Sequence, residues 1–278
     1  MLGKLIKHEF RATGRIMLPL LGAELLLSVL AGLSVRGLDH LEEMNFLGVT
    51  YVITLVVFSL GLFALTVVAF VLMIQRFYKN LLRDEGYITM TLPASVDAQI
   101  WAKLLVSFVW FVAVAVIIVI TILILASIGT RGNLLQILGF DAQRREILRE
   151  GIAQVGGGNI ALFALEYLLF SFIGSCAGCL LWYSAMAIGH SAADHKMLLS
   201  FVAFFVIYIA LNTITSGLLF GVLPKLDLDR LMASLDSIEG LLRFYHNYLR
   251  IGSGVGLLYD AVFYFVTRYF LKNKLNLA

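Results

Sequence analysis

Long uncharged runs dominate the chain. Residues 44–75 hold no charged side chain and no histidine over 32 positions, and residues 104–130 hold none over 27 positions. A bilayer core about 30 Å thick is crossed by about 20 predominantly apolar helical residues, so these runs predict membrane-spanning helices. Six windows meet or nearly meet this length: 16–35, 46–75, 104–128, 160–189, 198–223 and 252–270. The pattern predicts an all-α, polytopic membrane protein with six transmembrane helices.

Weaker amphipathic patterns predict further helices outside these windows. Between residues 2 and 11, apolar positions at helical spacing alternate with basic ones, which predicts an N-terminal helix lying along the membrane surface. Residues 141–154 predict a short external helix. Apolar positions between residues 226 and 245 recur mostly at three and four, which predicts an amphipathic external segment before the sixth helix. We expect a hinge at GSGVG, residues 252–256, between that segment and the last span.

A cleaved signal peptide is the alternative interpretation of the first window, because four basic residues precede it. Its apolar run is 20 residues long, which exceeds the usual length of about 7 to 15 in signal peptides, and no clear cleavage site follows. We therefore expect the first window to be a transmembrane helix.

Composition supports a membrane domain. The chain is 60% hydrophobic and 14% charged, whereas soluble domains carry about 25% charged residues. Because only three prolines occur and no linker-like tract is present, we expect one transmembrane domain over residues 1–278. Cys176 and Cys179 form a C-x-x-C pair inside the fourth window, and with no neighbouring His or Cys they are expected to pack rather than to bind metal.

The basic residues predict the orientation. With six spans, the face that holds both termini, residues 76–103 and residues 190–197 receives 12 Lys and Arg, and the other face receives 9. The net charges of the two faces are +7 and −1. Positive charge near span ends marks the cytoplasmic side, so both termini and residues 76–103 are predicted to be cytoplasmic.

Three acids interrupt the apolar windows: Glu24, Glu166 and Asp260. Each costs about 2.5–3.5 kcal/mol near the centre of a span, so each is expected to face the protein interior or a wet cavity. The favoured role is a structural one, in which they hydrogen-bond the backbone or neighbouring helices; lining a translocation path and relaying protons are the alternative roles. The spacing Gly-x-x-x-Gly, which permits close helix approach, occurs at 174–178, 217–221 and 252–256, and only one of the three need be meaningful.

Residues 77–105 read FYKNLLRDEGYITMTLPASVDAQIWAKLL and separate two of the longest apolar runs. Gly86 can turn the chain, Pro93 requires Leu92 to be extended, and Ser95 is a suitable N-cap for a helix that begins near Val96. The expected structure is a compact helix–turn–strand-like element. A simple return loop needs about 2 to 8 residues, so this longer insert is interpreted as a docking surface.

The stretch RFYKNLLRDEGYITMTLPAS followed by IWAKLL resembles the cytoplasmic segment after the second span of bacterial ABC-2 type ABC transporter permeases. AIGHSAADHKMLLS and the terminal YFLKNKLNL are similar to the second cytoplasmic turn and the ending of that family. The resemblance implies a permease subunit of an ATP-driven exporter in the bacterial cell membrane. It also implies a dimer with itself or a sister permease, and a separate ABC ATPase subunit that carries ATP and Mg.

The resemblance assigns ATPase contact to a coupling segment, residues 78–87. Its implied contact residues are Tyr78, Lys79, Leu81, Leu82, Arg83, Asp84, Glu85, Gly86 and Tyr87. Leu92, Pro93 and Ser95 would set the angle at which the third span enters the membrane. His195 and Lys196 would make a second ATPase contact.

Several other functions are not expected. The chain has no G-x-x-x-x-G-K-[ST] sequence to hold nucleotide phosphates, and no nucleophile–base arrangement is visible, so it is not expected to be an enzyme or to bind a cofactor itself. His190 and His195 are too poorly aligned for a metal pair and are expected to be solvated. Membrane lipid is an expected partner and nucleic acid is not.

Two alternative functions remain at this point: a proton-coupled secondary transporter and a membrane sensor or regulatory subunit that transports nothing. The resemblance leaves open whether the substrate is a peptide antibiotic, a drug, a lipid or a polysaccharide.

Overall fold

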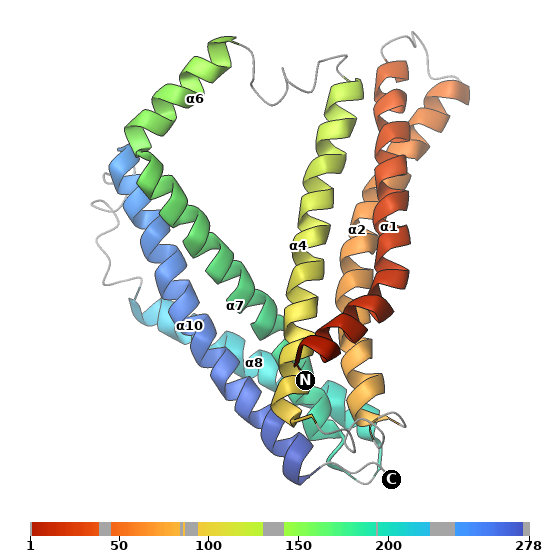
Figure 1. Ribbon diagram of the computed structural model, residues 1–278, viewed down its shortest axis with the longest axis vertical. Coiled ribbons are helices and arrows are strands. Elements are labelled where there is room, and N and C mark those ends of the chain that lie inside the picture. The colour runs from red at the N-terminus through yellow and green to blue at the C-terminus, as the bar shows by residue number, and fades with distance from the viewer. Residues whose placement is uncertain are drawn as a thin grey trace. The chain divides into compact units, whose positions relative to one another are not determined.

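The computed structural model describes residues 2–38, 46–83, 86, 94–129, 142–192, 194–222 and 237–274. Every regular element in these ranges is a helix (Figure 1). The elements are α1 (Leu2–Leu38), α2 (Phe46–Phe77), η1 (Tyr78–Leu82), α4 (Val96–Gly129), α6 (Ala142–Val155), α7 (Gly157–Gly189), α8 (Lys196–Val222) and α10 (Ile238–Asn273). Six of the described helices are long and apolar enough to cross a membrane. The predicted six-helix membrane protein is confirmed.

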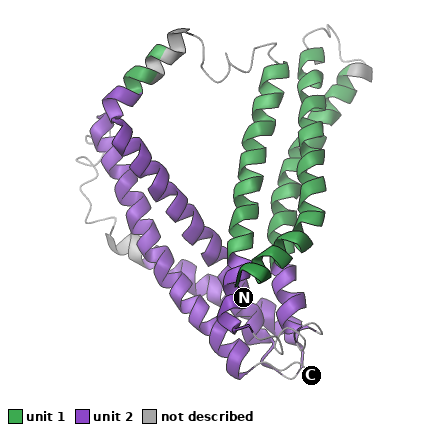
Figure 2. Ribbon diagram, viewed as in Figure 1, with its two compact units in different colours: residues 1–73, 105–151 green, residues 74–104, 152–278 purple. Residues whose placement is uncertain are grey.

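The described helices divide into two units (Figure 2). Unit 1 comprises residues 1–73 and 105–151, and unit 2 comprises residues 74–104 and 152–278. The expectation of a single transmembrane domain stays a prediction. The short helix expected at residues 141–154 is present as α6.

Helix α1 contains the predicted N-terminal surface helix as its first part, without a break in the helical backbone. Figure 1 shows this first part at an angle to the rest of α1. Pro19 lies inside the helix and lacks the N–H that would donate to the carbonyl of Arg15, so one hydrogen bond of α1 is missing there. The location of this part along a membrane surface stays a prediction.

Unit 1 is held together by an apolar core shared by α1, α2 and α4. Its buried residues are Met17, Leu21, Leu65, Ala69, Leu72, Met73, Val106, Trp110 and Val114. The indole N–H of Trp110 donates a 2.8 Å hydrogen bond to the hydroxyl oxygen of Thr13, which joins α4 to α1. The Thr13 hydroxyl in turn donates to the carbonyl of Glu9. The polar groups of Trp110 and Thr13 therefore both have partners from the protein.

Unit 2 is built around α7, which packs along α10 and against α8. A Cβ placed on Gly252 or Gly256 of α10 would lie 2.8 Å from Phe170 or 2.6 Å from Ile173 of α7. The Gly-x-x-x-Gly spacing at 252–256 therefore marks a helix contact. Apart from the nearby backbone of the same helix, no atom of the described residues lies within 4 Å of a Cβ placed on Gly174 or Gly217.

The hinge expected at GSGVG is wrong, because α10 is one continuous helix from Ile238 to Asn273. Ser237 caps its start by accepting a 3.0 Å hydrogen bond from the Gly240 amide. Side chains of α7 occupy the space beside two of the three glycines. This packing keeps the glycine-rich sequence helical, although glycine disfavours a helix in isolation. Residues 238–251, expected outside the last span, are its first turns, whereas residues 223–236 lie outside the described residues.

Gly189→Ala should destabilise unit 2. A Cβ at residue 189 would clash with the backbone amide and the hydroxyl of Ser200 and lie 2.6 Å from the Ser200 Cα, in the second turn of α8. Because backbone atoms cannot move aside cheaply, we expect a cost of about 1–3 kcal/mol, visible as a lower melting temperature in detergent.

Gly174→Ala in the same helix is the matched control. It meets no atom within 4 Å and replaces glycine by a better helix former, so it should leave the melting temperature unchanged or raise it. Equal melting temperatures for the two variants would contradict the close α7–α8 contact.

Candidate functional site

The end of α2 is tied tightly into unit 2. The ring of Phe77 stacks on Tyr183 of α7 at a centroid distance of 3.8 Å and an interplanar angle of 7°, and both side chains are 0% exposed. The chain then continues for five residues as the π-helix η1, and Arg83 is extended. The described start of the coupling segment is therefore anchored at its base.

Within the coupling segment, buried and exposed side chains separate clearly. Leu81 and Leu82 are buried within the chain, whereas Lys79 and Arg83 are exposed. The Tyr78 ring meets the His190 ring edge-on at 5.3 Å, and the Arg83 guanidinium lies 5.4 Å from the centre of the Tyr78 ring. Within the described part of the coupling segment, the basic side chains of Lys79 and Arg83 are therefore the most accessible to a partner.

Gly86 is buried, and its amide donates a 2.6 Å hydrogen bond to the Arg83 carbonyl, the bond of a turn at the place where the sequence predicts one. The other predicted residues of the insert, Asp84, Glu85, Tyr87, Leu92 and Pro93, lie outside the described residues. The strand-like part of the insert therefore stays a prediction.

Helix α4 begins as predicted, and its first turns form hydrogen bonds with the end of α2 and with α10. The Ser95 hydroxyl oxygen accepts a 3.2 Å hydrogen bond from the Ala98 amide, which confirms the N-cap. The buried ammonium of Lys103 donates to the Arg76 carbonyl at 3.3 Å. Asp97 in the first turn accepts from the Arg268 guanidinium of α10 at 2.7 Å and from the Tyr264 hydroxyl. Local sequence patterns do not predict these last two contacts, since more than 160 residues separate their partners.

The turn between α7 and α8 corrects one expectation. His190 is buried rather than solvated, because its imidazole caps the end of α7, its Nδ1 lying 3.0 Å from the Met186 carbonyl. Burial lowers the pKa of His190; the Met186 carbonyl opposes this shift, and the positive charges of Lys196 and Arg83 add to it. His195 is exposed with a φ of 52°, and Lys196 is half-buried at the start of α8.

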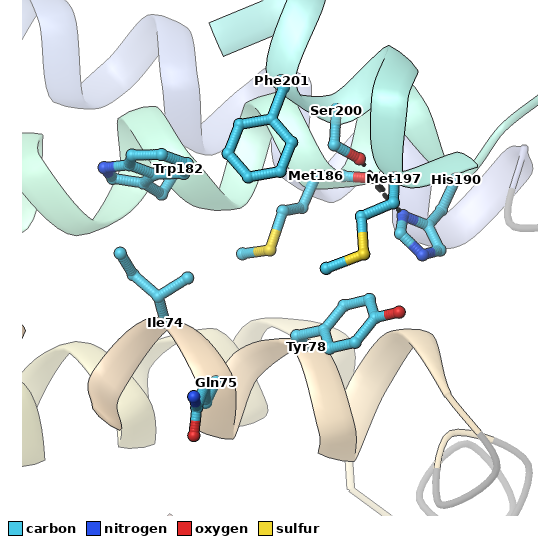
Figure 3. Close-up of a pocket in the computed structure, with 9 residues that line it drawn as sticks. All are labelled: Ile74, Gln75, Tyr78, Trp182, Met186, His190, Met197, Ser200 and Phe201. Carbon is cyan, nitrogen blue, oxygen red and sulfur yellow. Dashed lines mark hydrogen bonds between the residues drawn. The ribbon is translucent and has the colours of Figure 1, made fainter. Parts of the chain in front are cut away.

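A small apolar cavity lies where these segments meet (Figure 3). Its volume is about 120 Å³. It is lined by Ile74, Gln75, Tyr78, Trp182, Met186, His190, Met197, Ser200 and Phe201. Figure 3 shows residues of α2 and η1 on one side and residues of α7 and α8 on the other. A displacement of η1 would therefore change the shape of this cavity, which η1 lines together with α7 and α8.

The three acids of the apolar windows occupy separate places. Glu24 of α1 is 3% exposed and lies against Gly61 of α2 in unit 1, and its Oε1 has no hydrogen-bond partner among the described residues. Asp260 lines a second cavity in unit 2. The structure does not bring the acids together into one cluster.

Glu166 of α7 has partners that the sequence analysis missed. Its carboxylate accepts hydrogen bonds from the Arg250 guanidinium at 2.7 Å and from the His246 ring, both on α10. His246 and Arg250 are four residues apart and share one face of the helix. The four-residue spacing can be seen in the sequence. It indicates a shared helix face only when residues 246–250 are known to be helical, and they belong to α10, which starts at Ile238.

No group of three or more His, Cys, Asp or Glu residues suited to a metal ion occurs in the described part of the chain. Cys176 and Cys179 are both buried and form no disulfide, as expected for packing residues. Comparison of the chain with protein-family models, with curated proteins and with solved structures gives no match.

Phe77→Ala should weaken the base of the coupling segment. Removing a fully buried ring leaves a cavity beside Tyr183, and such losses cost about 3–5 kcal/mol in packed sites. Thermal denaturation in detergent should show a clear decrease in melting temperature.

Phe63→Ala in the same helix provides the comparison, because Phe63 is 69% exposed. Its melting temperature should stay close to that of the unmodified chain. A Phe77→Ala melting temperature as high as that of Phe63→Ala would argue against the stacked contact.

Proposed function

We propose that this chain is the membrane subunit of an ATP-driven exporter of the ABC-2 type, working with a separate ATPase subunit. The proposal draws on the resemblance of the insert, on the six apolar helices and on the excess of positive charge along one face. The chain would pair with itself or with a sister permease to form the translocation path in the bacterial cell membrane. ATP and Mg would be bound by the ATPase, since the sequence has no phosphate-binding loop.

One observation carries the proposal. The two segments to which the resemblance assigns ATPase contact are far apart in the sequence, yet Tyr78 of the first packs on His190 of the turn that contains the second. A partner bound to the exposed Lys79 and Arg83 would therefore also lie near this turn. A solvated loop without a partner would need no such anchored base.

The contacts of unit 2 offer a route for coupling. A force on η1 would reach α7 through the stacked rings of Phe77 and Tyr183, and would reach α4 through the Lys103 hydrogen bond to Arg76. Stacked aromatic pairs contribute about 0.5–1.5 kcal/mol beyond their burial, so they hold the two helices in register. ATP-driven closure of the partner would in this way move the membrane helices.

The contact of Glu166 with His246 favours a second candidate, a proton-coupled transporter. A carboxylate beside an imidazole within an apolar helix pair is an arrangement that can carry a proton. This candidate requires that Glu166→Gln abolishes transport driven by a pH gradient and that no ATPase subunit is involved.

Topology labelling tests the orientation. In a background with Cys176→Ala and Cys179→Ala, a cysteine at exposed Lys79 should react with a membrane-impermeant maleimide only after the cells are opened. A cysteine at exposed Arg149 of α6 should react in intact cells. Reaction of the Lys79→Cys variant in intact cells would end the proposal.

Charge reversal tests the contact with the ATPase. Arg83→Glu should reduce copurification of a P-loop ATPase subunit, and the vanadate-sensitive ATP hydrolysis of the complex, by about tenfold or more, because an exposed cation at the interface is replaced by an anion.

Arg149→Glu changes the charge by the same amount at an exposed position on the opposite predicted face and should have no effect. Retained copurification with Arg83→Glu, together with that of Glu85→Arg and Tyr87→Ala, would contradict the role of the coupling segment.

A further inference from the structure

A second cavity in unit 2 has a composition unlike the first. It lies among the start of α4, the middle of α7 and the second half of α10, and its volume is about 280 Å³. Four aromatic rings, one thiol and one carboxyl group stand among its otherwise aliphatic lining: Trp101, Phe172, Tyr264, Phe265, Cys176 and Asp260. Trp101 is 41% exposed and Phe265 is 64% exposed, so the cavity can be reached from outside the helices.

Asp260 supplies the one acidic group of this lining. Its Oδ1 is buried and has no hydrogen-bond partner among the described residues. A carboxylate in apolar surroundings is costly unless a cation or hydrogen-bond donor accompanies it. Without such a partner the group avoids this cost by holding its proton, so an occupant that brings positive charge would stabilise the ionised form.

The other charged and polar groups on this face of α10 are already engaged. Tyr264 and Arg268 follow Asp260 at intervals of four residues and so lie on the same side of the helix. Both donate hydrogen bonds to Asp97 of α4. The Arg268 charge is thereby compensated by Asp97, which leaves the carboxyl group of Asp260 as the uncompensated acid of the cavity.

The aromatic rings of the cavity also favour a cation over an anion or a neutral group. The faces of tryptophan, tyrosine and phenylalanine rings attract cations, and the attraction is stronger where water is excluded. The Trp101 and Tyr264 rings lie with their centroids 6.0 Å apart at one side of the cavity. An anion would meet an acid and the negative faces of the rings, whereas a neutral hydrocarbon would gain only apolar contact.

We propose that this cavity binds a lipophilic organic cation, a monovalent ammonium-type or pyridinium-type group with apolar substituents. The cationic centre lies beside Asp260 and the apolar substituents lie among the rings. The cavity is near the lower end of the usual range for ligand pockets, about 300–1,000 Å³, so the bound part of the ligand is small. This inference deepens the proposed function, on which it rests for its meaning, by naming the substrate class of the exporter.

Quenching of tryptophan fluorescence tests the inference on the full chain in nanodiscs of zwitterionic lipid. The probe is N-benzylpyridinium, a fixed cation whose pyridinium ring quenches indole. We expect saturable quenching that Trp101→Phe removes, since Trp101 is the tryptophan of this cavity. Neutral diphenylmethane, which has nearly the same shape, and anionic diphenylacetate should compete at least tenfold more weakly than benzyltrimethylammonium, a cation that lacks the quenching pyridinium ring. Equal competition by diphenylmethane would indicate a site for apolar groups alone and would overturn the proposal.

Asp260→Asn provides the second arm, because it keeps the shape and polarity of the side chain and removes the charge. Its affinity for N-benzylpyridinium should fall at least tenfold, whereas Glu239→Gln, which removes an exposed acid from the same helix, should change nothing. Unchanged affinity in Asp260→Asn would overturn the proposal. If this variant does not fold, the comparison of cationic and neutral competitors on the unmodified chain decides the question.

The two proposals can fail separately, because binding is measured without an ATPase. Saturable cation binding in a chain that recruits no ATPase would leave the cavity assignment standing and remove the exporter. Recruitment of an ATPase by a chain that binds no cation would do the reverse.

Discussion

A polar group inside a membrane protein must find its partner within the protein, and this constraint organises the whole molecule. In hydrocarbon, backbone amides and carbonyls are satisfied by helices, which is why the described regular structure is entirely helical. Serine and threonine hydroxyls follow the same rule by donating to carbonyls three or four residues earlier, as Ser28 and Thr121 do. Longer-range pairs such as Trp110 with Thr13, and Glu166 with Arg250, then fix which helices lie together.

Among the described residues, two buried acids depart from this rule. Leu81 and Leu82 are buried as expected for apolar residues, whereas one oxygen of Asp260 and one oxygen of Glu24 are buried without a hydrogen bond from the described residues. Glu24 lies close against α2 at Gly61, so closely that a Cβ at this position would clash with its carboxyl group. Asp260 lines an open cavity with aromatic walls. The two buried carboxyl groups thus differ in the space beside them, and the one at Asp260 adjoins a cavity that can hold a ligand.

Much of the fold could be predicted from the sequence, because the length of an uncharged run directly reports helix length in a bilayer. Ser95 and the helix start near Val96 were also readable, since capping depends on neighbours a few residues away. Contacts between distant segments were not readable. The burial of His190, the pairing of Glu166 with His246 and the continuity of α10 across GSGVG all depend on which helix packs alongside, and no local pattern encodes that choice.

The π-helical turn η1 has a consequence for motion at the base of α2. An α-helix advances about 100° and 1.5 Å per residue, and a π turn accommodates an additional residue within one turn. Conversion of Tyr78–Leu82 to α geometry would therefore change the direction of the residue directly after it by roughly a quarter of a revolution. Such a change of helix type would point the exposed guanidinium of Arg83 in a new direction while the stacked ring of Phe77 stayed in place. This short π-helical turn can therefore reorient Arg83 without moving the base of the segment.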